Sequence, residues 1–343
     1  MRKTAVVICP GRGTYNATEL GYLKANFRDA ALLAGFEAQR EAAGQPSLTE
    51  LDGAERFSLA RHTRGDNASG LIFAASYGDF LAIDRSKIEI VAVTGNSMGW
   101  YTALACGGAL APRDGFHVAN TMGTLMQHAL IGGQTVYPWM DEDWVVRPER
   151  KSELFALVCE IAARPGVELD LSIDLGGLLV MAGNEEGLKA FESAVPKAQQ
   201  RYPMRLGNHA AFHTHLQAPV AAQGRAALSR DPFGQPKLPM IDGCGAIWWP
   251  GASDIEALYD YTLGQQVTAS YDFTRAITVA AREFAPDLFI VLGPGTTLGG
   301  AVAQSLVAAQ WRGMTSKSEF KAHQDATSLL VSMGLPAQRG VVA

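Results

Sequence analysis

The stretch IEIVAVTGNSMG, which covers residues 88–99, decides the fold of this chain. Its first part, 88–94, is mostly apolar and β-branched, which predicts a buried strand. The segment GNSMG at 95–99 is a G-x-S-x-G pattern, and the small apolar residues at 100–110 are typical of a buried helix. A strand that enters a helix through G-x-S-x-G forms a nucleophile elbow, in which the turn lifts the serine oxygen above the sheet edge. We therefore predict that Ser97 is a nucleophile.

Two more buried strands end in glycine-containing turns. AVVIC at 5–9 is followed by a Pro-Gly-Arg-Gly turn, and LFIVL at 288–292 is followed by Gly-Pro-Gly and by small, helix-like residues. The segment that begins at Pro112 places apolar side chains at helical spacing, with proline in a favourable first-turn position. Several apolar strands that are each followed by a helix predict an α/β fold with a mainly parallel sheet.

The middle of the chain has a different character. A charged stretch there precedes a helical region, a strand-like segment LLVMA at 178–182 and a further helix. This order predicts a compact inserted α+β subdomain. The residues after Ser332 contain proline and glycine and are expected to be loosely held. The expected division is a large subdomain of 1–135 and 207–332, a small subdomain of 136–206 and a C-terminal tail of 333–343.

The charge and hydropathy patterns set aside two classes of partner. The chain has 343 residues with 29 Lys and Arg against 34 Asp and Glu, which gives a net charge of −5, and no long run of one sign occurs. We therefore expect no nucleic-acid partner. No stretch approaches the roughly 18 uninterrupted apolar residues of a membrane-spanning helix, so no membrane partner is expected.

The cysteines and histidines give no sign of a metal site. The four cysteines are far apart and form no C-x-x-C pair, which argues against a disulfide framework and against a cysteine zinc site, and favours a cytoplasmic location. His209, His213 and His215 are close in sequence, but no Cys or acidic residue lies among them and their spacing matches no standard zinc pattern. We expect no metal.

A serine nucleophile needs a base, and the sequence offers seven histidines without distances to choose between them. Here a family resemblance helps. The chain resembles the malonyl-CoA:acyl-carrier-protein transacylase family, which includes the acyltransferase domains of polyketide synthases. CPGRG at 9–13 stands where the family has F-P-G-Q-G, GNSMG at 95–99 where it has G-H-S-x-G, AFHTHL at 211–216 where it has A-F-H-S-P-L, and LGPG at 292–295 where it has its terminal L-G-P-G.

The resemblance implies a hydrolase-like large subdomain with a ferredoxin-like small insertion, and a ping-pong reaction through an acyl-serine. It implies that Ser97 is the nucleophile and that His213 is the general base and acid, oriented by a backbone carbonyl. The backbone amides of Met98 and Arg12 are implied as the oxyanion hole. The implied substrates are thioesters of coenzyme A or phosphopantetheine, the implied partner is an acyl carrier protein, and no further cofactor is expected.

The sequence departs from the family around the expected acyl pocket. Met122 stands where the family has an arginine that binds the free carboxylate of malonyl groups, and Asn96 replaces the histidine before the nucleophile. Both changes make the pocket less cationic, and Phe212 is expected to limit its size. Met122 is alternatively one more core methionine. Arg12 is either a solvent-facing loop residue or a relocated cation.

These departures lead to an expected function with open alternatives. Asp174 and Leu178, at positions where the family has Asn and Gln, also indicate a rebuilt pocket. We expect an acyltransferase of fatty-acid or polyketide biosynthesis that moves a neutral, non-malonyl acyl group. The alternatives are an acyl-thioester hydrolase of the same fold, a malonyl transferase that uses Arg12, and a non-catalytic component that binds a carrier protein.

Overall fold

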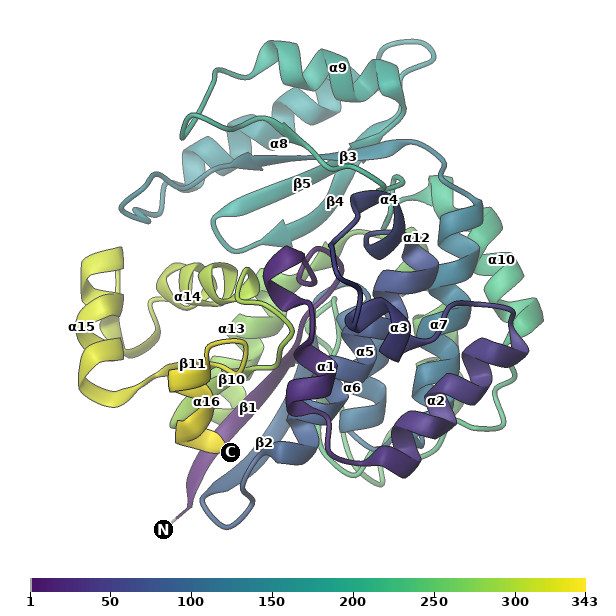
Figure 1. Cartoon of the computed structure of the whole chain (residues 1–343). Coiled ribbons are helices and arrows are strands. Elements are labelled where there is room, and N and C mark those ends of the chain that lie inside the picture. The colour runs from purple at the N-terminus through teal and green to yellow at the C-terminus, as the bar shows by residue number, and fades with distance from the viewer. Residues whose placement is uncertain (1) are drawn as a thin grey trace.

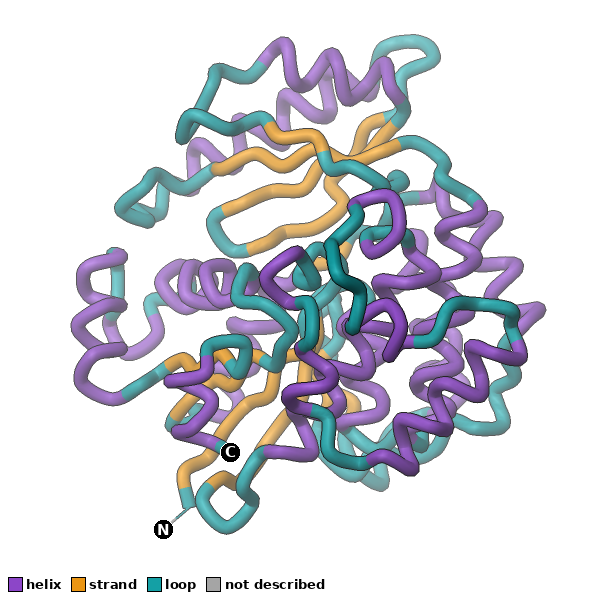
Figure 2. The backbone as a smooth tube through the Cα atoms, viewed as in Figure 1, coloured by secondary structure: helices purple, strands orange, loops and turns teal. Residues whose placement is uncertain are grey.

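The computed structural model describes residues 2–343, which form two β-sheets surrounded by helices (Figures 1 and 2). Neighbouring strands of the larger sheet are parallel, except for the hairpin pair at one edge. In spatial order these strands are β11 (Leu330–Ser332), β10 (Leu288–Val291), β1 (Lys3–Cys9), β2 (Ile88–Gly95), β7 (Met240–Ile241) and β8 (Ile247–Trp248). The three predicted strands 5–9, 88–94 and 288–292 therefore lie side by side at the centre of this sheet, which confirms the predicted α/β fold.

Helices cover both faces of the large sheet (Figure 1). The α-helices in this part are α1 (Tyr22–Asn26), α2 (Ala30–Ala42), α3 (Leu48–Asp52), α4 (Leu59–His62), α5 (Gly65–Ala82), α6 (Gly99–Cys106), α7 (Pro112–His128), α10 (Ala218–Ala227), α11 (Ile255–Asp260), α12 (Gln266–Thr268), α13 (Phe273–Phe284), α14 (Leu298–Ala308), α15 (Lys317–Thr327) and α16 (Pro336–Val342). Single turns of 3-10 helix are η1 (Ala17–Glu19), η2 (His215–Gln217) and η4 (Trp311–Gly313), and η3 (Tyr261–Gln265) is a π-helix that runs directly into α12. None of the helices that the structure describes is long and apolar enough to cross a membrane.

The smaller sheet has ferredoxin-like connections. Its elements follow one another as strand, helix, strand, strand, helix, strand, and the spatial order is β6 (Met204–Arg205), β3 (Gly133–Pro138), β5 (Leu178–Gly183), β4 (Leu169–Leu175) and β9 (Tyr271–Asp272). The helices α8 (Pro148–Ala162) and α9 (Glu185–Ala194) cover its outer face (Figure 1). The short β9 comes from the large part of the chain and pairs in parallel with β4, so this sheet extends beyond the residues 136–206 that we expected to form it.

Alternate side chains of the central strand β1 enter two different cores. Val7 and Cys9 pack with α5, α6 and α7, whereas Val6 and Ile8 pack with α13 and α14. The second core continues without interruption into the small subdomain through residues such as Val180. The strand period of two residues thus builds one core on each face of the large sheet, and the second core holds the small sheet over the ends of the central strands.

The segment 333–343, which we expected to be a loosely held tail, contains the ordered helix α16. The side chain of Val342 is fully buried in the first core, and its carbonyl accepts a hydrogen bond from the backbone of Asp84. Arg339 pairs with the buried carboxylate of Asp79 on α5. Apolar burial and an ion pair therefore hold this end of the chain in place, although its composition resembles that of a loop.

Candidate active site

Ser97 lies in a sharp turn between β2 and α6, with φ of 56°. A non-glycine residue with positive φ is strained, and such strain is common where a fold presents a reactive side chain. The turn is tight because Gly95 and Gly99 have no side chain. A Cβ atom on Gly95 would lie 2.3 Å from the carbonyl of Gly99, and a Cβ atom on Gly99 would lie 2.1 Å from the carbonyl oxygen of Cys9. The local geometry is that of a nucleophile elbow.

The structure brings His213 to Ser97 across 116 residues of sequence. The Oγ of Ser97 lies 2.7 Å from the Nε2 of His213, and the Nδ1 of His213 lies 2.7 Å from the backbone carbonyl oxygen of Gln266. Because a carbonyl can only accept a hydrogen bond, Nδ1 must carry the proton and Nε2 is left to accept one from the serine hydroxyl. This is the tautomer that a general base needs.

The imidazole of His213 is neutral at physiological pH. The residue is 3% exposed, and burial lowers its pKa from 6.5 to about 4, opposed by the hydrogen bond to the carbonyl of Gln266. Burial penalises the imidazolium because a charged ring loses its hydration. A neutral base that already lies within hydrogen-bond reach of the serine hydroxyl can take its proton during an attack on a carbonyl carbon.

The two residues expected to form the oxyanion hole flank Ser97. Met98 directly precedes α6, and Arg12 lies in the loop after β1, which approaches the elbow so closely that a Cβ atom on Gly11 would lie 2.5 Å from the carbonyl oxygen of Asn96. Within residues 2–343, no group accepts a hydrogen bond from the backbone amide of Met98 or of Arg12. Both amides therefore remain free to donate to a substrate oxygen, as an oxyanion hole requires.

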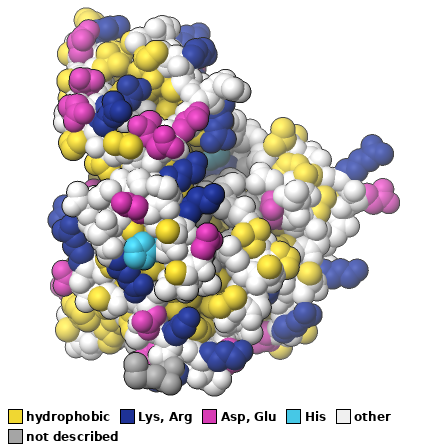
Figure 3. Space-filling view, turned by 90° about the vertical axis from the view of Figure 1, so that its left-hand side faces the viewer, with side chains coloured by type: hydrophobic (Ala, Val, Ile, Leu, Met, Phe, Trp, Pro, Cys, Tyr) yellow, Lys and Arg dark blue, Asp and Glu magenta, His cyan; other side chains and the backbone are white. Residues whose placement is uncertain are grey.

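A cavity of about 520 Å³ opens beside Ser97 and extends under the small sheet. Asn96, His213 and Phe212 lie in its wall, as do the two expected oxyanion residues. In Figure 3 the small upper part of the molecule rests directly on the large lower part. The apolar lining side chains come from both subdomains and include Met126, Val136, Ile173, Leu175, Leu178, Val180, Met204, Leu206, Val267 and Leu298, and the polar ones include Gln134, Arg201, His209 and Gln304.

The expected position of Met122 in the acyl pocket requires a correction. Its side chain is fully buried, packs toward Gly224 of α10 and is not among the residues that line the cavity. A Cβ atom on Gly224 would lie 2.7 Å from the Met122 sulfur. The same helix α7 instead presents Gly123 and Met126 to the cavity. Met122 is therefore a core residue, the alternative that the sequence had left open.

The two other departures in the small subdomain have different environments. Leu178 lies in the cavity wall, so an apolar side chain contacts the space where a substrate would lie. The carboxylate of Asp174 faces away, pairs with Lys151 and accepts a hydrogen bond from the hydroxyl of Thr274 at 2.6 Å. Only the first of these departures alters the cavity surface.

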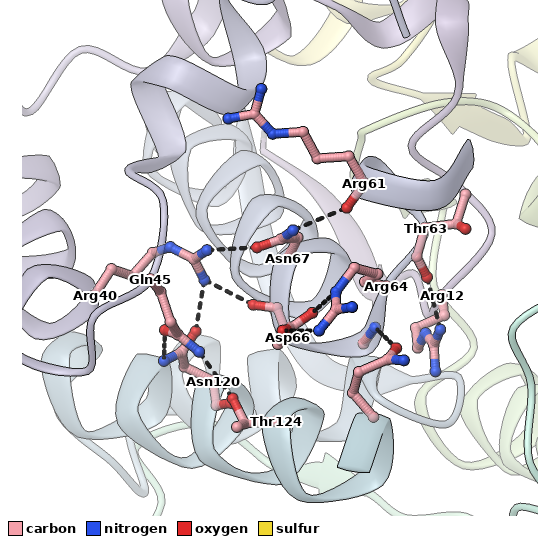
Figure 4. Close-up of polar contacts among 12 residues, drawn as sticks. Arg12, Arg40, Gln45, Arg61, Thr63, Arg64, Asp66, Asn67, Asn120 and Thr124 are labelled. Atoms are coloured by element: carbon pink, nitrogen blue, oxygen red, sulfur yellow. Dashed lines mark hydrogen bonds and ion pairs between the residues drawn. The ribbon is translucent and has the colours of Figure 1, made fainter. Parts of the chain in front are cut away.

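The side chain of Arg12 lies in the cavity wall, and Figure 4 shows it beside the carbonyl of Thr63. Its Nη2 donates to the backbone carbonyls of Thr63 at 2.8 Å and Asn208 at 2.9 Å, and its guanidinium lies 5.5 Å from the centre of the Phe212 ring. Its Nε and Nη1 are inaccessible to solvent and have no hydrogen-bond partner in the described part of the chain. Burial lowers the pKa of Arg12 to about 10, partly offset by Asp66, so the guanidinium remains charged at neutral pH.

Searches for related proteins give a consistent result at low identity. A scan against models of protein families finds no match. The chain is similar to the malonyl CoA-acyl carrier protein transacylase of Salmonella typhimurium, with 24% identity over 304 residues that cover 85% of this chain and 90% of the relative. The Bacillus subtilis protein of the same name is 22% identical over 69% of this chain and 71% of its own length. Polyketide synthase GfsA of Streptomyces halstedii matches 84% of this chain at 24% identity, and the matched region makes up 4% of the length of that synthase.

Solved structures with the same fold cover nearly the whole chain. The malonyl-CoA:ACP transacylase of Synechocystis sp. PCC 6803 has a TM-score of 0.73 at 18% identity and covers 99% of this chain and 100% of its own. The acyl-carrier-protein S-malonyltransferase of Burkholderia pseudomallei has a TM-score of 0.73 at 21% identity over 99% and 98% of the two chains. A malonyl-transacylase solved in complex with a type II polyketide synthase acyl-carrier protein has a TM-score of 0.70 at 18% identity, over 91% and 99%. These likenesses establish the fold.

Proposed function

We propose that this chain is a serine acyltransferase of the malonyl-CoA:acyl-carrier-protein transacylase family, and that it moves an acyl group between thioesters through an acyl-Ser97 intermediate. The observation that carries the proposal is the 2.7 Å contact between the Ser97 oxygen and the free imidazole nitrogen of His213. A hydroxyl, its base and two free backbone amides meet at the end of a 520 Å³ cavity. This arrangement fits acyl transfer.

In the proposed reaction, the Ser97 oxygen attacks the thioester carbonyl while His213 takes the hydroxyl proton at Nε2. The amides of Met98 and Arg12 stabilise the oxyanion. The carbon–sulfur bond then breaks, and the imidazolium returns its proton to the departing sulfur. A second thiol reverses these steps: it loses its proton to His213, attacks the acyl-serine and leaves with the acyl group.

We propose a neutral acyl group as the cargo, in fatty-acid or polyketide biosynthesis. The cavity wall is mostly apolar, and Met122, which the motif resemblance matches to the family's carboxylate-binding arginine, is a core residue. The uncharged side chains of Met126 and Leu178 face the cavity instead. An apolar cavity accommodates an alkyl group at lower desolvation cost than a carboxylate.

One observation favours a second candidate, a carboxylated acyl group. The Nε and Nη1 atoms of Arg12 are buried, charged and unpaired beside the cavity, and the buried Ser69 Oγ in the same wall also has no partner among residues 2–343. An unpaired buried guanidinium is costly, and a substrate carboxylate would relieve that cost. In this alternative Arg12 takes the role of the missing helix arginine.

The proposed partner is an acyl carrier protein, and the proposed location is the cytoplasm. The solved complex of a malonyl-transacylase of this fold with an acyl-carrier protein supports the choice of partner. The acyl donor in this proposal is a thioester of coenzyme A or of the carrier protein.

Intact-protein mass spectrometry tests the proposal. The protein is incubated with acetyl-CoA, octanoyl-CoA or malonyl-CoA, with Ser97→Ala as control, and then chased with holo carrier protein or with buffer alone. We expect a neutral acyl adduct on Ser97 that passes to the carrier protein and persists in buffer. Rapid loss to buffer would make the protein a hydrolase, and a persistent malonyl adduct that disappears in Arg12→Met would select the carboxylated candidate. If none of the thioesters forms an adduct, the remaining candidate is a non-catalytic protein that binds a carrier protein.

A further inference from the structure

The side chain of Gln266 connects the nucleophile elbow to α12, whose first residue supplies the backbone acceptor of His213. Its Nε2 lies 3.0 Å from the backbone carbonyl oxygen of Ser97, and its Oε1 lies 3.0 Å from the hydroxyl of Tyr101. The backbone carbonyl of the same residue accepts the hydrogen bond from His213. Gln266 is 2% exposed and begins α12 directly after the π-helix η3. One buried residue therefore contacts both members of the catalytic pair.

The contacts determine which way the Gln266 amide points. The Ser97 carbonyl can only accept a hydrogen bond, so the amide nitrogen must face it and the amide oxygen must face Tyr101. The Tyr101 hydroxyl must then donate. Burial raises the pKa of Tyr101, which keeps this hydroxyl protonated. By donating to the amide oxygen, the phenol holds the amide in the orientation that the Ser97 carbonyl requires.

We propose that the Gln266 side chain, locked by the Tyr101 hydroxyl, is a positioning residue that holds the strained Ser97 in its reactive orientation. Ser97 has φ of 56°, and its carbonyl otherwise receives only the backbone N–H of Trp100 among residues 2–343. A strained turn persists only where its surroundings fix it. The Gln266 amide fixes the Ser97 carbonyl, and through it the direction of the Oγ toward His213. This inference rests on the proposed role of Ser97 as nucleophile.

A neighbouring contact provides a matched control. The indole Nε1 of Trp100 donates to the hydroxyl of Thr262 at 3.0 Å, and both side chains are buried. This bond joins α6 to η3, the π-helix directly before α12, and it reaches neither Ser97 nor His213. Thr262→Val and Tyr101→Phe therefore each remove one buried hydroxyl that links α6 to the continuous segment of η3 and α12, and only the second frees the amide that holds the elbow.

The experiment compares Tyr101→Phe, Gln266→Met and Thr262→Val with the unchanged protein. Thermal unfolding is measured for each, and the kinetics of Ser97 acylation are followed with the thioester that labels the unchanged protein. We expect kcat to fall on the order of 10- to 100-fold in Tyr101→Phe and Gln266→Met, with KM little changed, because a small displacement of reacting atoms costs rate and not ground-state binding. In Thr262→Val we expect Tm to fall by about as much as in Tyr101→Phe and kcat to stay unchanged.

Two further readouts separate positioning from general damage. The pH at which activity is half lost should stay the same in Tyr101→Phe, since His213 keeps its backbone acceptor. The double variant of Tyr101→Phe and Gln266→Met should lose little more kcat than Gln266→Met alone, because the two groups act in one chain. A folded Tyr101→Phe or a folded Gln266→Met that acylates at the unchanged rate overturns the inference, as does an equal loss of kcat in Thr262→Val. If the unchanged protein forms no adduct at Ser97, the proposed function fails before this comparison begins.

Discussion

The Nδ1 of His213 lies 2.7 Å from the backbone carbonyl oxygen of Gln266, where a Ser-His-Asp triad would place a carboxylate. A carboxylate stabilises an imidazolium strongly, whereas a neutral carbonyl does so less. Burial is therefore the dominant influence, and it lowers the pKa of His213 to about 4. His213 remains neutral, and so able to accept a proton, well below physiological pH.

Acylation of Ser97 is expected to persist into mildly acidic solution. The rate should fall as the pH drops through about 4, since protonated His213 cannot accept the serine proton. The measurement is the rate of adduct formation by mass spectrometry across this range in short incubations, with the fold monitored in parallel by circular dichroism. Half-loss near pH 6.5, the ordinary histidine value, would show that the ring is solvated and not buried.

The same histidine makes stability depend on pH with a defined sign. The pKa of His213 is about 4 in the folded state and 6.5 in the unfolded state, so the unfolded state binds more protons between these values. The stability due to the neutral ring is therefore complete above pH 6.5 and is lost as the pH falls toward 4. Burial lowers the pKa of His209 to about 4 as well. His213→Gln should thus flatten the decline in Tm between pH 6.5 and 4 without removing it, and an unchanged slope would contradict the assignment.

Met122 and Met126 lie one turn apart on α7, and arginine at these two positions should have opposite effects. Met122→Arg buries an unpaired charge against Gly224, which is expected to cost several kcal/mol and to lower Tm without creating malonyl adducts. Met126→Arg places the cation in the cavity wall, where it is expected to be tolerated and to raise malonyl labelling of Ser97 relative to acetyl labelling. Thermal unfolding and competitive labelling with the two thioesters measure both effects. A stable Met122→Arg that gains malonyl use would place residue 122 at the cavity after all.

Met122 and Met126 show that the sequence predicts an element but not the direction of its side chains. The motif at 95–99 predicted the elbow because strand, turn and helix are consecutive, and the family resemblance proposed His213, which the structure places 2.7 Å from Ser97. A motif position gives a residue's place along α7 but not the direction of its side chain, so Met122 was assigned to the pocket although Met126 faces it. Local periodicity determines elements, whereas side-chain environments depend on packing between distant segments.

Two other features could not be located from the sequence. The resemblance implies a backbone carbonyl as the acceptor for His213, but any residue at position 266 would supply one, so no side-chain type marks Gln266 as its source. The partners of the Arg12 guanidinium are carbonyls 51 and 196 residues away, at Thr63 and Asn208. Both features depend on long-range contacts that become visible only once the chain is folded.

Gly99 is expected to tolerate no side chain. In Gly99→Ala the new Cβ would lie 2.1 Å from the carbonyl oxygen of Cys9, so the backbone of either β1 or the elbow must shift. We expect a loss of stability of more than about 3 kcal/mol, or a loss of Ser97 acylation on the order of 100-fold if the turn yields instead. Gly340→Ala is the control, because that helical glycine has no atom within 4 Å of the added Cβ, and alanine there should raise stability by about 0.5–1 kcal/mol. Tm and labelling rate are measured for both. A Gly99→Ala protein equal to the unchanged one in both respects would contradict the close approach.

Arg339 on α16 is expected to contribute strongly to stability through Asp79. The Asp79 carboxylate is 0% exposed, and burial raises its pKa, an effect that Arg339 partly offsets. It also accepts hydrogen bonds from the hydroxyl of Tyr22 at 2.6 Å and from the backbone of Gly293 at 2.8 Å, so it joins three distant segments at one point. Arg339→Met leaves that buried charge without a cation and is expected to cost about 3–5 kcal/mol.

Chemical denaturation measures this cost against two comparisons. Arg2→Met breaks a pair with Glu89 in which both side chains are about half exposed (51% and 50%), and it should cost no more than about 1 kcal/mol. The double variant of Asp79→Asn and Arg339→Met should recover part of the loss, because the remaining amide is uncharged and can still receive the Tyr22 hydroxyl. If Arg339→Met were no more costly than Arg2→Met, the segment 333–343 would contribute little to stability, as its composition alone had led us to expect.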